Sequence, residues 1–339
     1  MPKEALFYKK LDDKNVRCEL CPHFCKIADG EVGKCGVRYN EGGTLTTLVY
    51  EHAIANHVDP IEKKPLFHVF PGSRSFSIAT VGCNFFCKFC QNYDISQVRP
   101  RDNVNVPGRH FSIEEVVRTA KQNRCKSIAC TYTEPTIFYE YALDIAKLAR
   151  EEDIHTVLIS NGYITEAPID EIAPYITAAN IDLKSWDRDF YRDWVDGKLE
   201  SVLKALKRYK ARGIWVEVTT LLIPELVDKE DDLKHIAEFI STELGEETPW
   251  HISRFFPHYQ SLELSPTTVQ SLKRARQIAL DAGLRYVYTG NLPGDDGEST
   301  YCYQCGEKII SRYGFEVSEN KVADATCPVC GAKIDGIGL

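Results

Sequence analysis

The sequence contains no apolar run long enough to cross a bilayer, because a membrane helix needs roughly 20 apolar residues in succession. Its first twenty residues, MPKEALFYKKLDDKNVRCEL, lack the apolar segment of a secretory signal peptide. We therefore expect a cytoplasmic protein with no membrane partner. Positive charge is also scarce, since 41 Lys and Arg stand against 49 Asp and Glu. This balance disfavours nucleic acid bound through a broad basic surface.

Cysteine, in contrast, is abundant, with 13 in 339 residues. A cytoplasmic compartment keeps thiols reduced, so we do not expect disulfides. Cys125 and Cys130 stand alone and are read as buried apolar side chains. The other cysteines are grouped, which indicates metal ligation. The groups are Cys18, Cys21, Cys25 and Cys35; Cys83, Cys87 and Cys90; and Cys302, Cys305, Cys327 and Cys330.

Strand-like and helix-like runs alternate between residues 75 and 291. Ser112 and Glu115 form a capping box that predicts the start of one helix. Repeated β-α units with short connections predict a parallel sheet covered by helices, in a partial barrel or a doubly wound open sheet. The expected strands are 75–82, 127–135, 155–162, 178–185, 214–224, 249–257 and 285–291. The expected helices are 113–122, 136–150, 168–173, 189–211, 229–243 and 267–282.

Chemically active side chains recur where the expected strands end, among them Cys83, Glu134, Asn161 and Lys184. In (β/α) barrels the active site is built at these carboxyl ends, so the pattern favours a barrel. We expect an α/β protein with a partial (β/α)6-type barrel over residues 59–292. A cysteine-rich N-terminal segment over 1–58 and a zinc-ribbon-like C-terminal module over 293–339 are expected to flank it.

The stretch VGCNFFCKFCQN carries the spacing C-x3-C-x2-C but no fourth cysteine. A cubane iron–sulfur cluster takes four thiolates, so three would leave one iron open. An open metal position is what a catalytic site keeps for a substrate or cofactor. A partial zinc site is the alternative reading of the spacing alone.

With Phe89 before its last cysteine and a strand before its first, this motif resembles that of radical S-adenosylmethionine (SAM) enzymes. The stretches CTYTEPT, ISNGY, IDLKS and PWHISRFFP resemble the activating enzymes of glycyl radical enzymes. Residues 17–38, residues 59–73 and the C-terminal cysteine pairs resemble the Memo-associated, pyruvate formate-lyase activating enzyme-like group.

The resemblance implies a [4Fe–4S] cluster on Cys83, Cys87 and Cys90, whose open iron binds SAM. An electron, supplied by a donor such as flavodoxin or ferredoxin, would cleave SAM into a 5′-deoxyadenosyl radical that abstracts hydrogen. The residues that the resemblance places near SAM are Phe89, Asn92, Thr133, Glu134, Ser160, Asn161, Asp182, Lys184, His251 and Arg254.

Two of these expectations also have support from the residues themselves. Asp182 and Lys184 alternate along one expected strand, so they face the same side. Arg254 lies in an otherwise apolar strand, where it needs SAM, substrate or a structural carboxylate as a partner. One departure from the activases is Ile159, which stands where they carry an Asp used in a cation site.

Lys63 and Lys64 precede the first expected strand and are candidate contacts for a substrate carboxylate, if they point inward. A solvated loop is the favoured reading of this segment, because charge runs are usually exposed. The substrate residues are otherwise not identified by the sequence.

The two outer cysteine groups differ in what they predict. Cys302, Cys305, Cys327 and Cys330 form two Cys-x2-Cys-Gly pairs, the pattern of a closed zinc ribbon, with iron as the alternative metal. The N-terminal spacing, C-x2-C-x3-C-x9-C, fits zinc or a second cluster. We favour structural zinc there, because activases usually carry extra clusters in an insertion after the radical SAM motif. Residues 91–126 contain no such insertion.

Three functions are compatible with these patterns. The first is a radical SAM enzyme, an oxidoreductase, that abstracts hydrogen from a small molecule. The second is an activating enzyme that generates a glycyl radical on a partner protein. The third is a non-catalytic zinc-ribbon module that binds RNA or protein. The three-cysteine motif disfavours the third, since a structural site has no reason to remain one ligand short.

Overall fold

The computed structural model describes residues 3–98 and 106–339. At its centre is an eight-stranded sheet in the order β16-β15-β14-β13-β12-β11-β9-β8. The strands are β8 (Ala55–Pro60), β9 (Arg74–Ala79), β11 (Ser127–Cys130), β12 (His155–Ser160), β13 (Ala178–Asp182), β14 (Trp215–Leu222), β15 (Trp250–Arg254) and β16 (Val287–Gly290).

The strands of this sheet from β9 to β16 run parallel, and their order in the sheet is their order along the chain, except that β10 (Arg109–His110), between β9 and β11, belongs to another sheet. An order without reversal is that of a barrel, whereas a doubly wound sheet reverses direction at its centre. Strand β8 is antiparallel to β9, and no pairing joins β8 to β16 within the described residues. The predicted partial barrel is therefore confirmed, with an antiparallel strand added at one edge.

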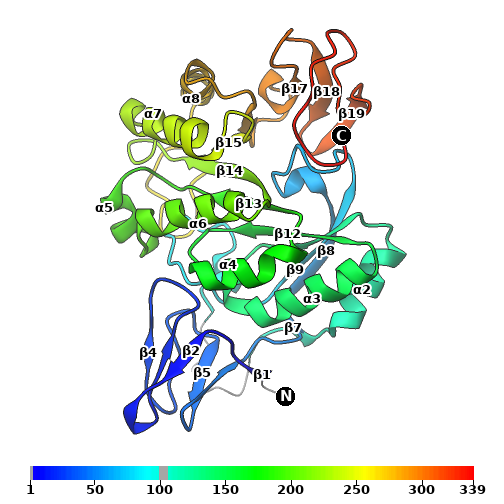
Figure 1. The fold of residues 1–339 in the computed structure, drawn as a ribbon. Helices are drawn as coiled ribbons and strands as arrows, with labels where there is room; N and C mark the ends of the chain where they lie inside the picture. Colours follow the sequence, from blue (N-terminus) through cyan, green and yellow to red (C-terminus); the bar gives the residue numbers. More distant parts are fainter. Residues whose placement is uncertain (1–2, 99–105) are drawn as a thin grey trace.

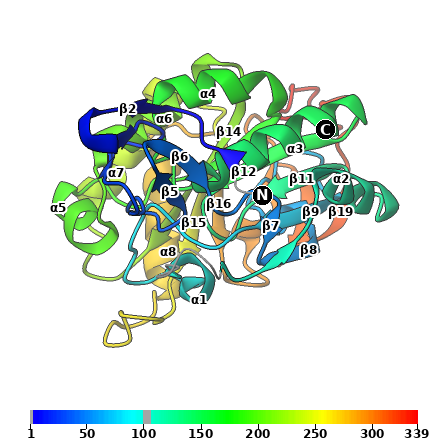
Figure 2. The ribbon, with the colours of Figure 1, turned by 90° about the horizontal axis from the view of Figure 1, so that it is seen from below.

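Helices connect the parallel strands and cover the outer side of the sheet, as α3, α4 and α6 show (Figures 1 and 2). The α-helices are α1 (Tyr93–Ser96), α2 (Ile113–Gln122), α3 (Tyr139–Glu151), α4 (Glu166–Ile172), α5 (Arg188–Phe190), α6 (Leu199–Ala211), α7 (Glu230–Phe239) and α8 (Val269–Asp281). Shorter 3-10 turns are Asp12–Lys14, Ile61–Lys63, Pro135–Phe138, Ala173–Tyr175 and Asp296–Glu298, and π-helical turns are Tyr191–Val195 and Ile240–Leu244. None of the described helices has both the length and the apolar character that a membrane crossing requires.

Helix α2 begins where the capping box predicts. The Glu115 amide donates to Ser112 Oγ at 3.3 Å, and the Ser112 amide donates to Glu115 Oε2 at 3.1 Å. These bonds satisfy two donors that have no partner within the helix. Val116, Val117 and Ala120 then lie on one face and are buried.

The prediction of a single helix over residues 189–211 is wrong, because the helix is interrupted there and the chain forms α5, a π-helical turn and α6. Asp196 adopts left-handed backbone angles, with φ 61°, and ends the turn. A Cβ built on Gly197 would lie 2.4 Å from Phe85 Cε1, so the break brings the backbone against the loop that follows β9. Helical periodicity does not reveal this tertiary contact.

Small sheets flank the barrel at both ends of the sequence. The N-terminal sheets are β1 (Lys3–Glu4), β6 (Thr44–Thr47) and β5 (Arg38–Glu41), and β2 (Tyr8–Lys10), β3 (Val16–Cys18) and β4 (Lys26–Ile27). A two-stranded sheet pairs β7 (His52–Ala53) with β10 (Arg109–His110). The C-terminal sheet is β17 (Thr300–Tyr301), β18 (Lys308–Tyr313) and β19 (Glu316–Asn320). Figure 1 shows the N-terminal strands and β17–β19 at opposite ends of the molecule.

The C-terminal module packs against the segment between β8 and β9. Val69 forms a parallel bridge with Ile337, and the Phe70 amide donates to the Ile337 carbonyl at 2.8 Å. Arg312 of β18 donates to the Phe67 carbonyl at 2.8 Å. Residues 67–70, which also border the barrel interior, are thereby held by a part of the chain more than two hundred residues away.

Candidate active site

The loop that carries Cys83, Cys87 and Cys90 follows β9 and is held by the N-terminal segment. Gly82 has φ 95°, and a Cβ built on it would lie 2.8 Å from the Cys35 carbonyl oxygen and 2.9 Å from Val37. A larger residue would therefore force the two segments apart. His23 Nε2 lies 2.7 Å from the Asn84 carbonyl oxygen and adds a second link.

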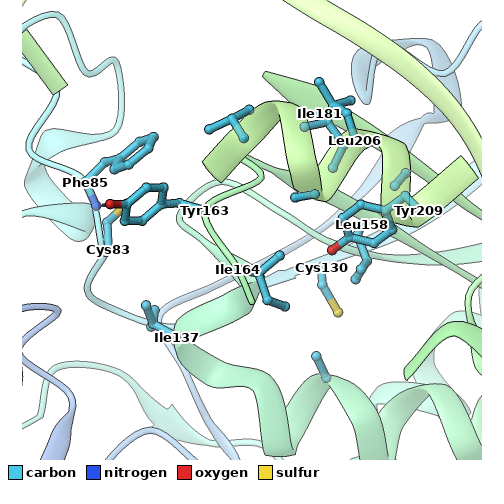
Figure 3. Packing of buried hydrophobic residues seen from close by; sticks show 14 of the residues in the cluster. Cys83, Phe85, Cys130, Ile137, Leu158, Tyr163, Ile164, Ile181, Leu206 and Tyr209 are labelled. Carbon is cyan, nitrogen blue, oxygen red and sulfur yellow. Dashed lines mark hydrogen bonds between the residues drawn. The ribbon is translucent and has the colours of Figure 1, made fainter. Parts of the chain in front are cut away.

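The other side of this loop packs on the barrel. Phe85 lies against Tyr163, with ring centroids 4.8 Å apart, beside Cys83 (Figure 3). The Phe86 amide donates to the Val195 carbonyl and the Lys88 amide to the Trp194 carbonyl, so the loop bonds directly to the π-helical turn. The three cysteines are thus positioned by backbone contacts on both sides.

Cys83, Cys87 and Cys90 line one cavity of ≈ 550 Å³ at the carboxyl ends of the parallel strands. No fourth cysteine is among the described residues that line it. The Phe85 amide donates to Cys83 Sγ at 3.3 Å, and the Asn161 side-chain amide donates to the same sulfur at 3.8 Å. Burial raises the pKa of the Cys87 thiol to about 12, so ligation of a metal there releases a proton.

Most of the side chains that the sequence places near SAM or substrate line this same cavity. They are Lys63, Lys64, Phe89, Asn92, Thr133, Ser160, Asn161, Asp182, Lys184 and His251. Glu134 and Arg254 do not line it, and each has another set of partners.

Glu134 lies behind the cavity wall and accepts hydrogen bonds from this chain's own donors. Its Oε1 accepts from the Thr136 amide at 2.9 Å and from Ser160 Oγ at 2.8 Å, and its Oε2 accepts from the Asn161 amide at 2.8 Å. It also caps the 3-10 turn Pro135–Phe138. These bonds position Ser160 and the Asn161 amide, and the contact between Glu134 and SAM stays a prediction.

Arg254 points away from the cavity. Its Nε donates to the Thr267 carbonyl at 2.8 Å, and its guanidinium lies 4.8 Å from the centroid of the Phe256 ring. These contacts offset the free energy that an arginine loses when a strand takes its charge out of water. The contact of Arg254 with cofactor or substrate stays a prediction.

Asp182 is the last residue of β13 and Lys184 lies two residues beyond it, and both line the same cavity, as the alternation predicts. Lys184 Nζ lies 2.9 Å from Asp182 Oδ2, and both line the cavity. Burial disfavours the charge of Lys184, but Asp182 and Cys87 outweigh it and raise the pKa of this lysine above its ordinary value. The pair therefore brings a fixed positive and a fixed negative charge to the region of Cys87.

Hydrogen bonds fix three further polar side chains. Asn92 Nδ2 donates to the Tyr132 carbonyl at 2.7 Å, and Thr133 Oγ1 donates to the Thr80 carbonyl at 2.8 Å. Asn161 Nδ2 donates to Asn84 Oδ1 at 2.8 Å. Tyr132 itself has φ 63°, and this turn of the backbone carries the segment after β11 back to the cysteine loop.

His251 belongs to a buried network that the sequence did not predict. Its Nε2 lies 2.6 Å from Glu217 Oε2, and the same carboxylate accepts from the amides of Phe67 and His68. Burial opposes the charge of Glu217, yet these donors keep the pKa of its carboxyl below the ordinary value. Glu217 is a charged residue inside the apolar stretch IWVEVTTLLIP, and this anomaly was the available signal.

Lys63 and Lys64 both bind one carboxylate. Lys63 Nζ lies 3.0 Å from Asp59 Oδ1, Lys64 Nζ lies 2.7 Å from Asp59 Oδ2, and the Tyr132 hydroxyl also donates to Asp59. Burial lowers the pKa of Lys64 to about 8, although Asp59 opposes this change. The reading of this segment as a solvated loop is wrong for Lys64, which is 1% exposed. Asp59 and Tyr132 were not singled out as site residues.

The C-terminal cysteines converge as a mononuclear metal site requires. Cys302 Sγ and Cys330 Sγ are 3.6 Å apart, and Cys305 Sγ and Cys327 Sγ are 3.8 Å apart. Four thiolates about 2.3 Å from one zinc in a tetrahedron lie about 3.8 Å from one another. The spacing of the sulfurs therefore fits a single ion.

The remaining cysteines are also free thiols. Cys18, Cys21, Cys25 and Cys35 line a second, smaller cavity together with Arg38. Cys130 is fully buried among apolar side chains such as Leu158 and Tyr209 (Figure 3), which agrees with its reading as a core thiol.

A partial (β/α) barrel with three cysteines after its first parallel strand defines the class of radical SAM proteins. The model of the Radical SAM superfamily matches residues 77–240. A radical SAM methyltransferase from Sphaerobacter thermophilus has the same fold, with a TM-score of 0.52 at 17% identity over 68% of this chain and 71% of that one.

Comparison with curated proteins extends the likeness over nearly the whole chain. The uncharacterized protein MJ0808 of Methanocaldococcus jannaschii is 45% identical over 335 residues, which are 98% of this chain and 99% of the relative. The pyruvate formate-lyase-activating enzyme of Clostridium pasteurianum is 25% identical over 227 residues, 63% of this chain and 84% of the relative. The chain belongs to the radical SAM superfamily and is homologous to activating enzymes of glycyl radical enzymes. Membership implies binding of SAM and a [4Fe–4S] cluster.

We expect the C-terminal site to bind one zinc. In the C302S/C305S variant, zinc measured by elemental analysis should fall by about one per chain, since a tetrahedral site with two ligands removed holds its ion weakly. The C125A variant, which removes a buried cysteine outside the groups, should keep its zinc. Unchanged zinc in C302S/C305S would show that these cysteines are not its ligands.

Proposed function

We propose that this protein is a radical SAM enzyme that abstracts hydrogen from a small-molecule substrate bound in the cavity beside Cys83, Cys87 and Cys90. The observation that carries the proposal is that one cavity brings together three cysteines, the Asp182–Lys184 pair and a positively charged wall. The cysteines leave a cubane one protein ligand short, which is the arrangement that SAM completes. Bound there, cluster and SAM supply a 5′-deoxyadenosyl radical.

In this proposal different residues of the chain bind different groups of SAM. Lys184 binds the carboxylate or a ribose hydroxyl of SAM, and Asp182 accepts from a ribose hydroxyl. Asn92, Thr133, Ser160, Asn161 and His251 surround the same space, and Phe89 covers it beside Lys184. Glu217 holds His251 in place through the 2.6 Å hydrogen bond, so the imidazole presents a fixed face to the cavity.

The wall at Lys63 and Lys64 favours an anionic small molecule. Two lysines share the single carboxylate of Asp59, which leaves a net positive charge. Glu62, which also lines the cavity, lies 3.6 Å from Arg312, so that pair contributes no net charge. A carboxylate or phosphate on the substrate would find its counter-charge here.

Generation of a glycyl radical on a partner protein is the second candidate, supported by the homology to activating enzymes. We also place the chain in the Memo-associated group, on the segments 17–38 and 59–73 and the C-terminal cysteine pairs. A flavodoxin- or ferredoxin-like electron donor and a cytoplasmic location complete the proposal, since free thiols suit a reducing compartment.

The cysteine motif is tested by SAM cleavage. The anaerobically reconstituted and reduced protein should form 5′-deoxyadenosine, and C83A, C87A and C90A should each abolish its formation, because every thiolate holds a separate iron. The C125A variant should retain cleavage. Continued formation of 5′-deoxyadenosine in the variant that lacks all three cysteines would refute the assignment.

The SAM contacts are tested by affinity. K184A and D182A should each weaken SAM binding about ten- to a hundredfold, since charge-assisted hydrogen bonds contribute roughly 1.5–3 kcal/mol. Equilibrium dialysis against cluster-loaded protein gives the affinity, and iron content shows that the cluster remains. The surface variant K207A should bind normally. Unchanged affinity in both variants would move this pair away from the cofactor.

The charged wall is tested with malonate as a small carboxylate probe. Because Lys64 loses its proton as pH rises through about 8, the net charge of its cluster with Lys63 and Asp59 falls to zero. Calorimetric malonate affinity should therefore drop about tenfold between pH 7 and pH 9. K63A should bind weakly already at pH 7, whereas K207A should match the unmodified protein. Affinity that is independent of pH and of Lys63 would exclude this wall as an anion site.

A further inference from the structure

The N-terminal cysteines lie in a built cavity of their own. Cys18, Cys21, Cys25 and Cys35 line a small cavity, with Arg38 and the segment Thr136–Ile137 completing the wall. Cys18 ends strand β3, and Cys35 lies just before β5, so two different small sheets supply the ligands. Cys18 and Cys35 are buried, and the cavity is closed by the barrel behind it.

The spacing of their sulfurs differs from that of the C-terminal cysteines. Among the described residues, Cys302, Cys305, Cys327 and Cys330 are the one group of three or more potential ligands whose atoms all lie within 4.8 Å of one another. Neither the N-terminal four nor the group Cys83, Cys87 and Cys90 meets that limit. A single zinc draws its thiolates together, whereas a cubane holds each thiolate on a separate iron and so keeps them farther apart. The N-terminal sulfurs, like those of Cys83, Cys87 and Cys90, are therefore not gathered as closely as those of the C-terminal site.

Arg38 supplies a second, independent observation. It is 1% exposed and lines the cavity, its terminal nitrogens donate to Glu140, and its Nε has no hydrogen-bond partner in the described part of the chain. A buried donor without a partner is costly, and a ligand sulfur inside the cavity would satisfy it. Hydrogen bonds to sulfur and buried charge are also the means by which proteins adjust iron–sulfur clusters.

We propose that Cys18, Cys21, Cys25 and Cys35 hold a second [4Fe–4S] cluster, in place of the structural zinc that the sequence favoured. Four protein thiolates leave no open iron, so this cluster binds neither SAM nor substrate and its chemistry is confined to electron storage and transfer. Its position suits that role, because Cys35 contacts Gly82, the residue directly before Cys83.

The two clusters can be separated by a variant that leaves the N-terminal block intact. In anaerobically reconstituted C83A/C87A/C90A protein, about four irons and four sulfides should remain, with the absorption near 400 nm of a cubane cluster. On reduction this protein should show a cluster signal in electron paramagnetic resonance that SAM leaves unchanged. The unmodified chain should contain about eight irons and, from the C-terminal site, about one zinc.

A further change links the remaining iron to the N-terminal block. Adding C18A and C35A to that variant should remove the iron, whereas adding C302S and C305S should remove zinc and leave the iron in place. C83A/C87A/C90A protein that contains no iron and about two zincs would overturn the proposal in favour of structural zinc, and about two irons would overturn the cubane assignment. Both results would leave the SAM-cleaving site of the proposed function unaffected, because its own test uses the unmodified chain.

Discussion

The close approach of Gly82 to Cys35 and Val37 is the constraint on which the active site depends. The loop that carries the three SAM-cluster cysteines has no regular structure of its own, so its shape comes from what touches it. The N-terminal segment presses on one side, and Phe85, Val195 and Trp194 hold the other. A side chain at residue 82 would push the loop away from the N-terminal segment. Cys83, Cys87 and Cys90 would then no longer line one cavity.

A second layer of buried polar contacts fixes the walls around that loop. Glu134 binds Ser160 and the Asn161 amide, and Glu217 binds His251 together with the backbone of residues 67 and 68. Both carboxylates are buried and accept several hydrogen bonds each; burial raises the pKa of Glu134, whereas the donors around Glu217 hold its pKa below the ordinary value. They do not reach into the cavity, but they determine where the side chains that line it point.

The sequence predicted the class of fold and most of the cavity, and the reason lies in periodicity. Strand-like runs and short connections determine which residues come at the carboxyl ends of strands, so Cys83, Asn161, Asp182 and Lys184 were placed correctly. The contacts of Arg254 with Thr267 and Phe256 could not be predicted, because strand alternation does not specify how a long side chain bends. The break before α6 was missed because it depends on Phe85, a residue more than one hundred positions away.

The pairing of Val69 and Phe70 with Ile337 has a consequence for the order in which the protein is completed. A chain leaves the ribosome from its N-terminus, so residues 62–72 emerge long before the strand and loop that hold them. Until Arg312 and Ile337 arrive, Glu62 lacks its partner Arg312, and residues 67 and 68 are held from the barrel side by Glu217. Docking of the C-terminal module is therefore the last step that completes this wall.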